Sequence, residues 1–497
     1  MAQDTSHVSF RDIPNNTNEK WWKDASLRLN VLYCFGYDQS LLTGLQALPQ
    51  WNEHFDTPHG TRLGLIAACI FLPGIIFGFP AAWICTHWGR KWCVIIGAAF
   101  IVVGAIWNGL APDIEHFMVS RVILGIGGSI TKVGAPALLQ ESAHPRIRSE
   151  MGHMYYSFYY VGSLVSAIMC SQVIGPIVVL LILIKAPESP RYMIKKGMHD
   201  KALHTLAKYH ANGDTNDALV KWEMREIEQT IEQESQDNKS SYFDFFKTRG
   251  NRKRLWISLS ISVGINWVGN GIVSYYLSPV LKSVGVVKPS HLLSINAGLS
   301  VWNLIIAEAA ALKIDDYGIR PLFLTSTIGM IISYAFVMGF SAGFAEAGTS
   351  ALGIAAIPFL FTFFGSYSLA WTPLNYSYTT TIMPFNLRAK GLALYLVVQN
   401  MANAFNQFVN PIALQAITWK YYAVYIAIDI AYAIGIYLWF PETKQLTIEE
   451  ISLVFDFPGR DGRKMAAAAL ANRMRDGGST DRESDSVKVD MNHVESK

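Results

Sequence analysis

The chain has 497 residues, of which 51% are hydrophobic and only 16% are charged. Soluble globular proteins carry about 25% charged residues, so this composition excludes an ordinary soluble protein and predicts that much of the chain lies in a bilayer. A formal net charge of +3 lacks the strongly basic balance of a nucleic-acid-binding protein, and we expect no nucleic-acid partner.

A polar N-terminal segment, residues 1–26, precedes a series of apolar runs with the length of a membrane-spanning helix, about 20 residues. The predicted spans are residues 27–48, 62–86, 92–111, 116–139, 151–170, 172–186, 255–284, 291–314, 320–343, 350–383, 388–415 and 419–440. They predict an all-α polytopic membrane protein with about twelve transmembrane helices.

A charged interval after the sixth span divides the chain into two halves. Residues 27–186 are predicted to form an N-terminal transmembrane bundle, and residues 255–440 a C-terminal one. Between them, residues 187–254 are predicted to be a helical cytoplasmic loop, because residues 218–233 carry mixed charges at helical spacing. Residues 441–497 form a predicted cytoplasmic tail, disordered after about residue 458.

Basic residues occur in alternate loops between the spans. The loops rich in basic residues contain Lys20, Lys23, Arg28, Arg90, Lys91, Arg146, Arg148, Arg320, Arg388 and Lys390. Cytoplasmic loops carry an excess of Lys and Arg, so this distribution places both termini in the cytoplasm. We expect a multi-pass protein of the plasma membrane, in contact with lipid.

The fifth and sixth predicted spans share an unusually short stretch of chain. Two crossings and a turn have only about 36 to 38 residues between Ser149 and Ala186, and a helix of about 17 residues is only about 26 Å long. Either this hairpin is unusually short or residues have been lost from it, and we favour loss. The second case leaves open a nonfunctional product.

The two halves repeat several sequence elements in the same order. His87 to Lys91 after the second span matches Asp315 to Arg320 after the eighth, and Pro187-Glu188-Ser189 matches Pro441-Glu442-Thr443. Glu141, Pro145 and Arg148 match Thr381, Pro384 and Arg388. Such parallel repetition is typical of transporters in which two six-helix bundles move about a site between them.

These motifs resemble the sugar porter family of the major facilitator superfamily over about residues 35–450. The most specific are Pro187 to Tyr192 (PESPRY), Pro441 to Lys444 (PETK), Arg121 followed by Gly125 and Gly127, and Asn270 with Tyr275 and Tyr276. The segments 35–38 (FGYD), 44–46 (GLQ) and 136–141 (PALLQE) resemble the fungal branch with lactose and cellodextrin permeases. The resemblance implies the major facilitator fold.

The resemblance also implies a cytoplasmic gate in which charges at helix ends pair only while the inner ends of the bundles are close. Its expected residues are Gly89, Arg90, Lys91, Glu141, Arg148, Glu188, Arg191, Asp315, Arg320, Arg388 and Glu442. The alternative is that these charges only anchor loops among lipid headgroups. The second half departs from the family pattern, because Thr381 replaces an acid and Ile319 a base, so we expect the N-terminal half to hold the gate more strongly.

An acid and a base within apolar spans are candidates for proton coupling. Asp38 lies in the first span and Arg121 in the fourth. A carboxylate at membrane depth is costly, and a change in its distance from an arginine changes its affinity for a proton. In the proton-coupled sugar porters that this chain resembles, such a pair carries the coupling. The alternative is a permanent structural ion pair.

Amides and aromatic side chains in the C-terminal spans are candidates for sugar binding, because amides both donate and accept hydrogen bonds without charge. The predicted substrate-binding residues are Asn266, Asn270, Tyr275, Tyr276, Asn296, Trp371, Asn375 and Asn400, with Asn403 as a further candidate. Tyr156, Tyr159 and Tyr160 are expected either to face the same cavity or to pack in the core. Each amide can instead bind a neighbouring helix.

Together these observations predict a secondary-active sugar transporter that works by alternating access, with a sugar and protons as its substrates. A facilitative carrier or exporter of a polyol-like metabolite and a non-transporting nutrient sensor remain alternatives. The sequence shows no nucleophile triad and no metal-ligand cluster, so we expect no enzyme, no metal and no cofactor. We expect a monomer.

Overall fold

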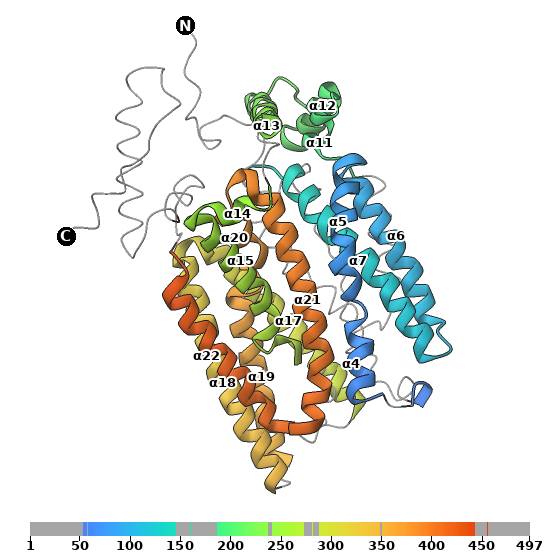
Figure 1. Cartoon of the computed structure of the whole chain (residues 1–497), viewed down its shortest axis with the longest axis vertical. Coiled ribbons are helices and arrows are strands. Elements are labelled where there is room, and N and C mark those ends of the chain that lie inside the picture. The colour runs from blue at the N-terminus through green and yellow to red at the C-terminus, as the bar shows by residue number, and fades with distance from the viewer. Residues whose placement is uncertain are drawn as a thin grey trace, which may run out of the picture.

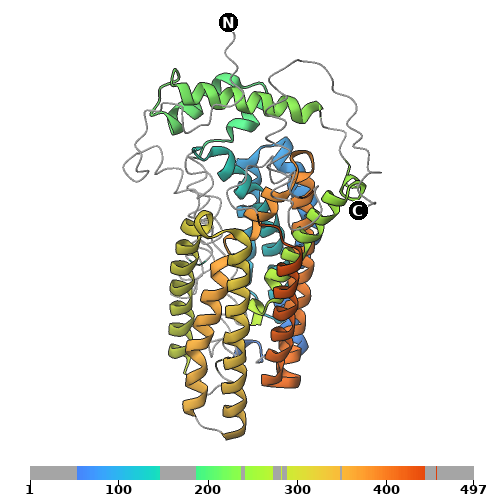
Figure 2. The same ribbon diagram turned by 90° about the vertical axis from the view of Figure 1, so that its left-hand side faces the viewer.

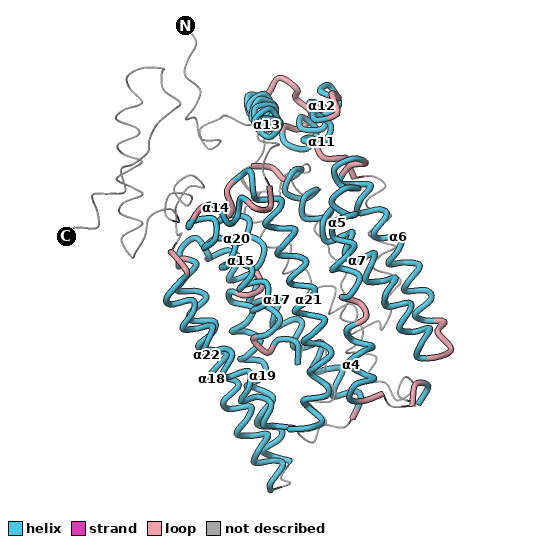
Figure 3. Tube along the Cα trace, in the orientation of Figure 1, coloured by secondary structure: helices cyan, strands magenta, loops and turns pink. Residues whose placement is uncertain are grey.

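The computed structural model describes residues 53–56, 58–145, 160, 186–236, 241–272, 281, 288–347, 350–442 and 455. Within these ranges the chain forms helices and no strand, which confirms the predicted all-α class. The membrane helices stand side by side in two groups, and shorter helices lie across one end (Figures 1 and 3).

The N-terminal group contains four described helices. They are α4 (Gly60–Ala68), α5 (Leu72–His87), α6 (Arg90–Gly109) and α7 (Ile114–Ser142). Helices α6 and α7 pack along each other, and an added Cβ at Gly127 would lie only 2.6 Å from the carbonyl oxygen of Gly97. The glycines of this stretch therefore allow the two helices to pack closely.

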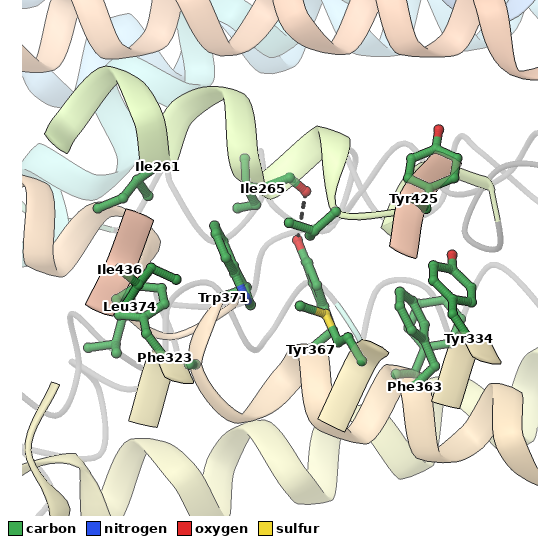
Figure 4. Packing of buried hydrophobic residues seen from close by; sticks show 14 of the residues in the cluster. Ile261, Ile265, Phe323, Tyr334, Phe363, Tyr367, Trp371, Leu374, Tyr425 and Ile436 are labelled. Atoms are coloured by element: carbon green, nitrogen blue, oxygen red, sulfur yellow. Dashed lines mark hydrogen bonds between the residues drawn. The ribbon is translucent and has the colours of Figure 1, made fainter. Parts of the chain in front are cut away.

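The C-terminal group is the larger one in the described part of the chain. It comprises α15 (Arg249–Trp267), α17 (Pro289–Tyr317), α18 (Ile319–Ala347), α19 (Ser350–Ala370), α20 (Leu374–Ile382), α21 (Phe385–Ile417), the short 3-10 helix η3 (Thr418–Lys420) and α22 (Tyr421–Trp439). Its core consists of buried aromatic and branched residues, including Phe323, Tyr334, Phe363, Tyr367 and Trp371 (Figure 4).

Eight stretches of the described chain are long and apolar enough to cross a membrane: Gly60–His87, Arg90–Gly109, Ile114–Leu139, Arg249–Ile272, Ser290–Ala311, Ile319–Ala347, Ala351–Ile382 and Lys390–Trp439. The last has 50 residues, about 75 Å as a helix, and contains both α21 and α22, so it corresponds to two predicted spans. These stretches match the predicted spans in order and position. The first predicted span and most of the fifth and sixth, including the short hairpin, lie outside the described residues.

Large hydrophobic side chains cover the outer faces of these helices. Ile76, Phe79, Ile332, Ile354 and Phe405 each expose about half or more of their surface. Exposure of so much apolar surface to water is unfavourable, whereas contact of the same surface with lipid is not. The outward faces therefore support a membrane-embedded fold. The two helix groups thus bury their polar residues inside and present apolar surface outside.

The segment between the two groups forms a small helical unit at one end of the molecule (Figure 2). It consists of α11 (Pro190–Lys195), α12 (His199–His210) and α13 (Ala218–Gln236), and the short α14 (Asp244–Lys247) follows. His210 Nδ1 lies 2.6 Å from Glu223 Oε2 with both side chains buried, and His210 Nε2 lies 3.1 Å from the carbonyl oxygen of Ser142 at the end of α7. The unit is therefore docked directly on a membrane helix.

The two groups meet where α21 packs against α4 and α5. An added Cβ at Gly64 would lie 2.5 Å from the Phe408 carbonyl oxygen, and one at Gly74 would lie 2.6 Å from the Asn400 amide. Glycines thus allow close approach of helices from different halves. Tyr160, from the first half of the sequence, makes a second contact with the C-terminal group: its hydroxyl lies 2.9 Å from Ser368 Oγ and 3.1 Å from Thr372 Oγ1.

Candidate functional site

The turn between α5 and α6, with the residues that bind it, is here named the N-terminal junction. Arg90 begins α6 and forms a two-point ion pair with Glu141 near the end of α7, with Nε 2.8 Å from Oε2 and Nη2 2.9 Å from Oε1. Both side chains are largely buried, with 14% and 17% exposure. Ser189 Oγ, before α11, donates to the same carboxylate. The junction therefore ties α6, α7 and the small helical unit together.

Glu188 binds the beginning of α6 through its carboxylate. The backbone N–H of Lys91 donates to it at 3.0 and 3.2 Å, and the N–H of Ser189 donates at 2.9 Å. A carboxylate at this place satisfies N–H groups that have no partner within the helix and interacts favourably with the helix dipole. Gly89 makes this possible, because its φ is +109° and an added Cβ would lie 2.9 Å from Glu188 Cδ.

Tyr192 closes the N-terminal junction on the side of α11. Its hydroxyl donates to the His87 carbonyl oxygen at 2.8 Å, and the Arg90 guanidinium lies 5.7 Å from its ring centroid. Burial and the negative charge of Glu188 raise the pKa of the Tyr192 hydroxyl, which therefore remains a hydrogen-bond donor at neutral pH.

The turn between α17 and α18, with the residues that bind it, is here named the C-terminal junction, and it repeats part of this arrangement. Glu442 accepts hydrogen bonds from the N–H groups of Ile319 and Arg320, both at 3.2 Å. Gly318 has φ +90°, and an added Cβ would lie 3.1 Å from the Glu442 carboxylate. The Arg320 guanidinium donates to the Tyr437 carbonyl oxygen. The predicted repeat therefore has a structural counterpart.

The acid and base that differ between the halves also differ in their contacts. Ile319 occupies the place of Arg90 and packs against the C-terminal core. Thr381 occupies the place of Glu141, and its hydroxyl donates to the Ser377 carbonyl oxygen of its own helix at 2.8 Å. In the second half, the places of this ion pair are therefore taken by an apolar side chain with apolar contacts and by a hydroxyl with an acceptor in its own helix, and neither requires a charged partner.

The remaining residues predicted for these junctions have the following positions. Arg191 lies half-buried in α11, and Arg388 lies half-buried in the first turn of α21. The backbone of Asp315 belongs to the last turns of α17. Arg148 lies outside the described residues.

Helix α15 ends at Trp267, and the chain turns before a short helical continuation at residues 270–272. The interruption frees carbonyl groups, and three neighbouring helices supply donors to them: Tyr367 to Ile265 at 3.2 Å (Figure 4), Asn406 to Asn266 at 2.5 Å, and Tyr334 to Gly269 at 2.7 Å. Gly269 has φ +92°, a conformation that glycine adopts without strain. Discontinuous helices of this kind form substrate sites in membrane transporters.

Three half-buried polar side chains from different helices meet beside this interruption. Asn266 Nδ2 on α15 lies 3.1 Å from the Ser262 carbonyl oxygen and 3.3 Å from that of Gln399 on α21. The Tyr376 hydroxyl on α20 donates to Gln399 Oε1 at 2.9 Å. Tyr376 and Gln399 were not among the predicted residues, although their places one residue after Asn375 and one before Asn400 were within reach of the sequence argument.

The other residues predicted to bind substrate are distributed over the C-terminal group. Trp371 is almost fully buried and lies beside Phe323 in the core (Figure 4). Its ring packs edge-on against those of Phe323 and Tyr432, at centroid distances of 5.3 and 5.6 Å. Asn375 is fully buried on α20, and Asn400 packs against Gly74 of the N-terminal group. Asn270 and Asn296 are half-buried on α15's continuation and on α17. Tyr275, Tyr276, Tyr156 and Tyr159 lie outside the described residues.

Of the two residues predicted for proton coupling, the structure describes Arg121. Arg121 is buried in α7, with its guanidinium 5.9 Å from the ring centroid of Phe117, whereas Asp38 lies outside the described residues. The structure also reveals an acid that the sequence argument missed: Asp429 is fully buried in the middle of α22. The sequence signal that could have identified Asp429 is the presence of an acid within the apolar run 419–440.

Comparisons with known proteins agree with this architecture. The family model described as "Sugar (and other) transporter" matches residues 30–455. The chain is 25% identical over 443 residues to the MFS-type transporter criB of Aspergillus cristatus, which covers 85% of this chain and 91% of that one. It is 24% identical over 454 residues to a high-affinity glucose transporter of Kluyveromyces lactis, with 84% and 82% covered.

Among solved structures, the chain resembles the proton:xylose symporter XylE of E. coli bound to 6-bromo-6-deoxy-D-glucose. The TM-score is 0.68 at 20% sequence identity, and the match covers 86% of this chain and 99% of that one. This likeness confirms the predicted major facilitator fold. The relatives described here are transporters, in agreement with the prediction that the chain is not an enzyme.

Proposed function

The chain belongs to the sugar (and other) transporter family of the major facilitator superfamily, and from this premise we propose that it carries a sugar together with protons by alternating access. The observation that carries the proposal is the pair of equivalent junctions, each with a glutamate bound to the first turn of a membrane helix. Equivalent devices at the same end of two bundles suit a movement of one bundle against the other.

The sugar would bind beside the interruption of α15. Asn266, Tyr376 and Gln399 provide donors and acceptors from three helices, all half-buried and none charged. A sugar needs such groups at several hydroxyls together with an aromatic face for its C–H surface, and Tyr376 supplies the ring. The names of two relatives, a glucose transporter and a xylose symporter, support a monosaccharide as the substrate.

The N-terminal junction would act as the main lock of a cytoplasmic gate. Arg90 and Glu141 hold α6 to α7, and Ser189 adds the small helical unit to the same carboxylate. We place this end in the cytoplasm because basic residues concentrate there. Opening toward the cytoplasm would require Arg90 and Glu141, or their links to α11, to separate.

Proton coupling is proposed for Asp38 with Arg121. Arg121 is buried at membrane depth, where an arginine is retained only for a strong interaction, and a relative of the same fold is named a proton:xylose symporter. A carboxylate that faces this arginine in one state and loses it in another would bind and release a proton during each cycle.

The proposal is tested with the full-length protein in liposomes that contain a pH-sensitive dye. We expect that glucose or xylose added outside the liposomes enters together with protons. We also expect that Asp38→Asn abolishes accumulation of the sugar against a gradient while exchange of labelled sugar continues. Sugar exchange without proton movement by the unaltered protein would favour a facilitative carrier, and a lack of transport of either sugar would favour another substrate or a sensor.

The sugar site is tested separately. Tyr376→Phe and Gln399→Ala are expected to raise KM at least tenfold, because each removes a hydrogen-bonding group from the site (about 1.4 kcal/mol for a factor of ten). Tyr395→Phe is the matched control, since its ring lies 5.1 Å from that of Tyr376 but is fully buried in the core. An unchanged KM in the first two variants would remove them from the site.

A further inference from the structure

Asp429 lies near the middle of α22, on the face that is turned toward the interior of the C-terminal group. It is the ninth residue of this 19-residue helix, which is about 28 Å long. The buried residues of α22 are Tyr421, Tyr422, Tyr425, Asp429 and Ile436, whereas Ile430, Ile434 and Leu438 are exposed on the opposite face. A carboxyl group therefore occupies an interior position of an otherwise aromatic and aliphatic stripe.

The surroundings of Asp429 contain aromatic side chains and hydroxyl groups. Of the described titratable groups, Tyr334 on α18 and Tyr432 on α22 lie within electrostatic range of it, and Tyr422 and Tyr425 lie on the same buried face of α22. The charged residues on the described helices packed against α22 lie near the helix ends: Arg320 and Glu346 on α18, Arg249, Arg252, Lys253 and Arg254 on α15, Arg388 and Lys390 on α21, and Lys420 on η3.

These charged groups are too distant to stabilise a carboxylate at position 429. Lys420 is nine residues away, about 13 Å along the helix, and Arg254 precedes by six residues, about 9 Å, the Ser260 carbonyl oxygen that accepts a hydrogen bond from Tyr432. Within the described part of the chain, neither carboxyl oxygen of Asp429 has a hydrogen-bond partner. An ionised carboxylate in such a place costs several kcal/mol, whereas a neutral acid avoids most of that cost.

Tyr334 packs on the buried face of α22 that carries Asp429, with its ring centroid 5.5 Å from that of Tyr422 and 6.2 Å from that of Tyr425, and it connects this face to the interruption of α15. Its ring stacks on Phe363 at a centroid distance of 4.0 Å, and its hydroxyl donates to the Gly269 carbonyl oxygen at 2.7 Å (Figure 4 shows the ring pair). An ionised Asp429 would offer this hydroxyl a charged acceptor, and hydrogen bonds to charged acceptors are about twice as strong as those between neutral groups. After loss of its proton, the Asp429 carboxylate would therefore compete with the Gly269 carbonyl oxygen for the Tyr334 hydroxyl.

We propose that Asp429 is a proton-binding site of the C-terminal group, filled in the arrangement described here, and that loss of its proton weakens the Tyr334–Gly269 hydrogen bond at the interruption of α15. Asp429 belongs to the second half of the sequence, whereas Asp38 and Arg121 belong to the first. Because the sugar-binding residues flank the same interruption, the consequence for sugar affinity rests on the proposed function, whereas proton binding itself does not.

Infrared spectroscopy of the full-length protein in lipid nanodiscs tests proton binding directly. We expect a carbonyl band of a protonated carboxylic acid at neutral pH that is lost in Asp429→Asn, retained in Asp38→Asn, and lost from the unaltered protein at alkaline pH. If Asp429→Asn does not fold, Asp429→Glu serves instead and should shift the band. A spectrum that is identical with and without the Asp429 carboxyl would overturn the proposal.

The link to Tyr334 is tested by thermal stability without any sugar. A folded chain that holds a proton which the unfolded chain has released becomes less stable as the pH rises. We therefore expect the apparent melting temperature of the unaltered protein to fall by several degrees between neutral and alkaline pH, and that of Asp429→Asn to fall less. Tyr334→Phe should be less stable at every pH and should show a larger fall between the two pH values, because it removes the donor that would stabilise an ionised Asp429. Equal pH dependence in all three proteins would contradict the coupling, even if no sugar is transported.

Discussion

The N-terminal and C-terminal junctions have the same backbone design and different side-chain chemistry. In both, a glycine with positive φ separates two membrane helices, and a glutamate from a distant segment binds the first turn of the second helix. The N-terminal junction adds an ion pair between neighbouring helices, Arg90 with Glu141, and the equivalent places of the C-terminal junction hold Ile319 and Thr381. The difference shows that the glutamate cap and the ion pair are independent parts, and that the second half can lose one while it keeps the other.

The way in which the C-terminal junction lost the pair explains why the loss is tolerated. Removing one partner of a buried ion pair leaves an unsatisfied charge, whereas removing both leaves none. Ile319 adds apolar contact with the core, and Thr381 binds a carbonyl of its own helix. The N-terminal junction, which also includes Ser189 and Tyr192, joins its helices through this ion pair and through side-chain hydrogen bonds from the segment around α11.

The largest effect in this comparison is expected from Arg90→Ala. It leaves the Glu141 carboxylate largely buried without its cation, which should cost about 3 kcal/mol of the free energy of unfolding. Denaturation by sodium dodecyl sulfate in mixed micelles measures this loss. Adding Glu141→Gln to Arg90→Ala should recover part of the stability, because the stranded charge is then removed. Additive losses in the double variant would show that the two residues do not act as a pair.

A second contrast concerns the two glycines. Gly89→Ala should destabilise the protein by about 2 kcal/mol, because it combines a strained positive φ with displacement of the Glu188 carboxylate. Gly318→Ala has similar strain but more room, since its Cβ would lie 3.1 Å from the Glu442 carboxylate, and should cost about 1 kcal/mol. The same denaturation measurement compares them. A larger loss at Gly318 would contradict the view that the N-terminal junction is the tighter one.

The sequence predicted the large features because they depend on local patterns. Apolar run length placed the spans within a few residues of the helices, for example residues 320–343 against Ile319–Ala347. Repeated motifs located both junctions, and the Thr381 and Ile319 departures were visible as residue types. Arg90 and Glu141 are 51 residues apart in the sequence, and no local pattern connects them. Their bidentate pairing was therefore suggested only by the resemblance to a family.

Side-chain direction within the C-terminal group was beyond the reach of the sequence. Trp371 and Tyr376 are both aromatic and five residues apart, yet the chain turns between α19 and α20, so that Trp371 packs in the core while Tyr376 reaches Gln399. Helical periodicity does not apply across such an interruption, and the face of each residue depends on three-dimensional packing. The sequence shows Asp429 as an acid within an apolar run, but it does not show that its side chain faces the interior of the C-terminal group.

The two glutamate caps should contribute nearly equally. Glu188→Gln and Glu442→Gln each retain a single acceptor oxygen and lose the charge that interacts with the helix dipole, so each should cost about 1 kcal/mol. Denaturation of the two variants side by side provides the measurement. A difference larger than the sum of their errors would indicate that the caps are not equivalent, and the separation of cap and ion pair would then need revision.

The smallest effect tests whether the missing pair can be restored. Ile319→Arg and Thr381→Glu together recreate in the C-terminal junction the residue types of Arg90 and Glu141, and a partly exposed pair of this kind should show a coupling energy of about 0.5 kcal/mol in a double-mutant cycle. The matched control replaces Thr381→Glu by Thr381→Gln, which keeps the length and removes the charge. The coupling should decrease as salt is added, because screening acts on charge and not on shape. If the proposed gate depends on such pairs, the restored pair should also slow sugar exchange across the membrane, whereas the glutamine control should not. Coupling of equal size in both combinations would mean that packing, rather than charge, distinguishes the two junctions.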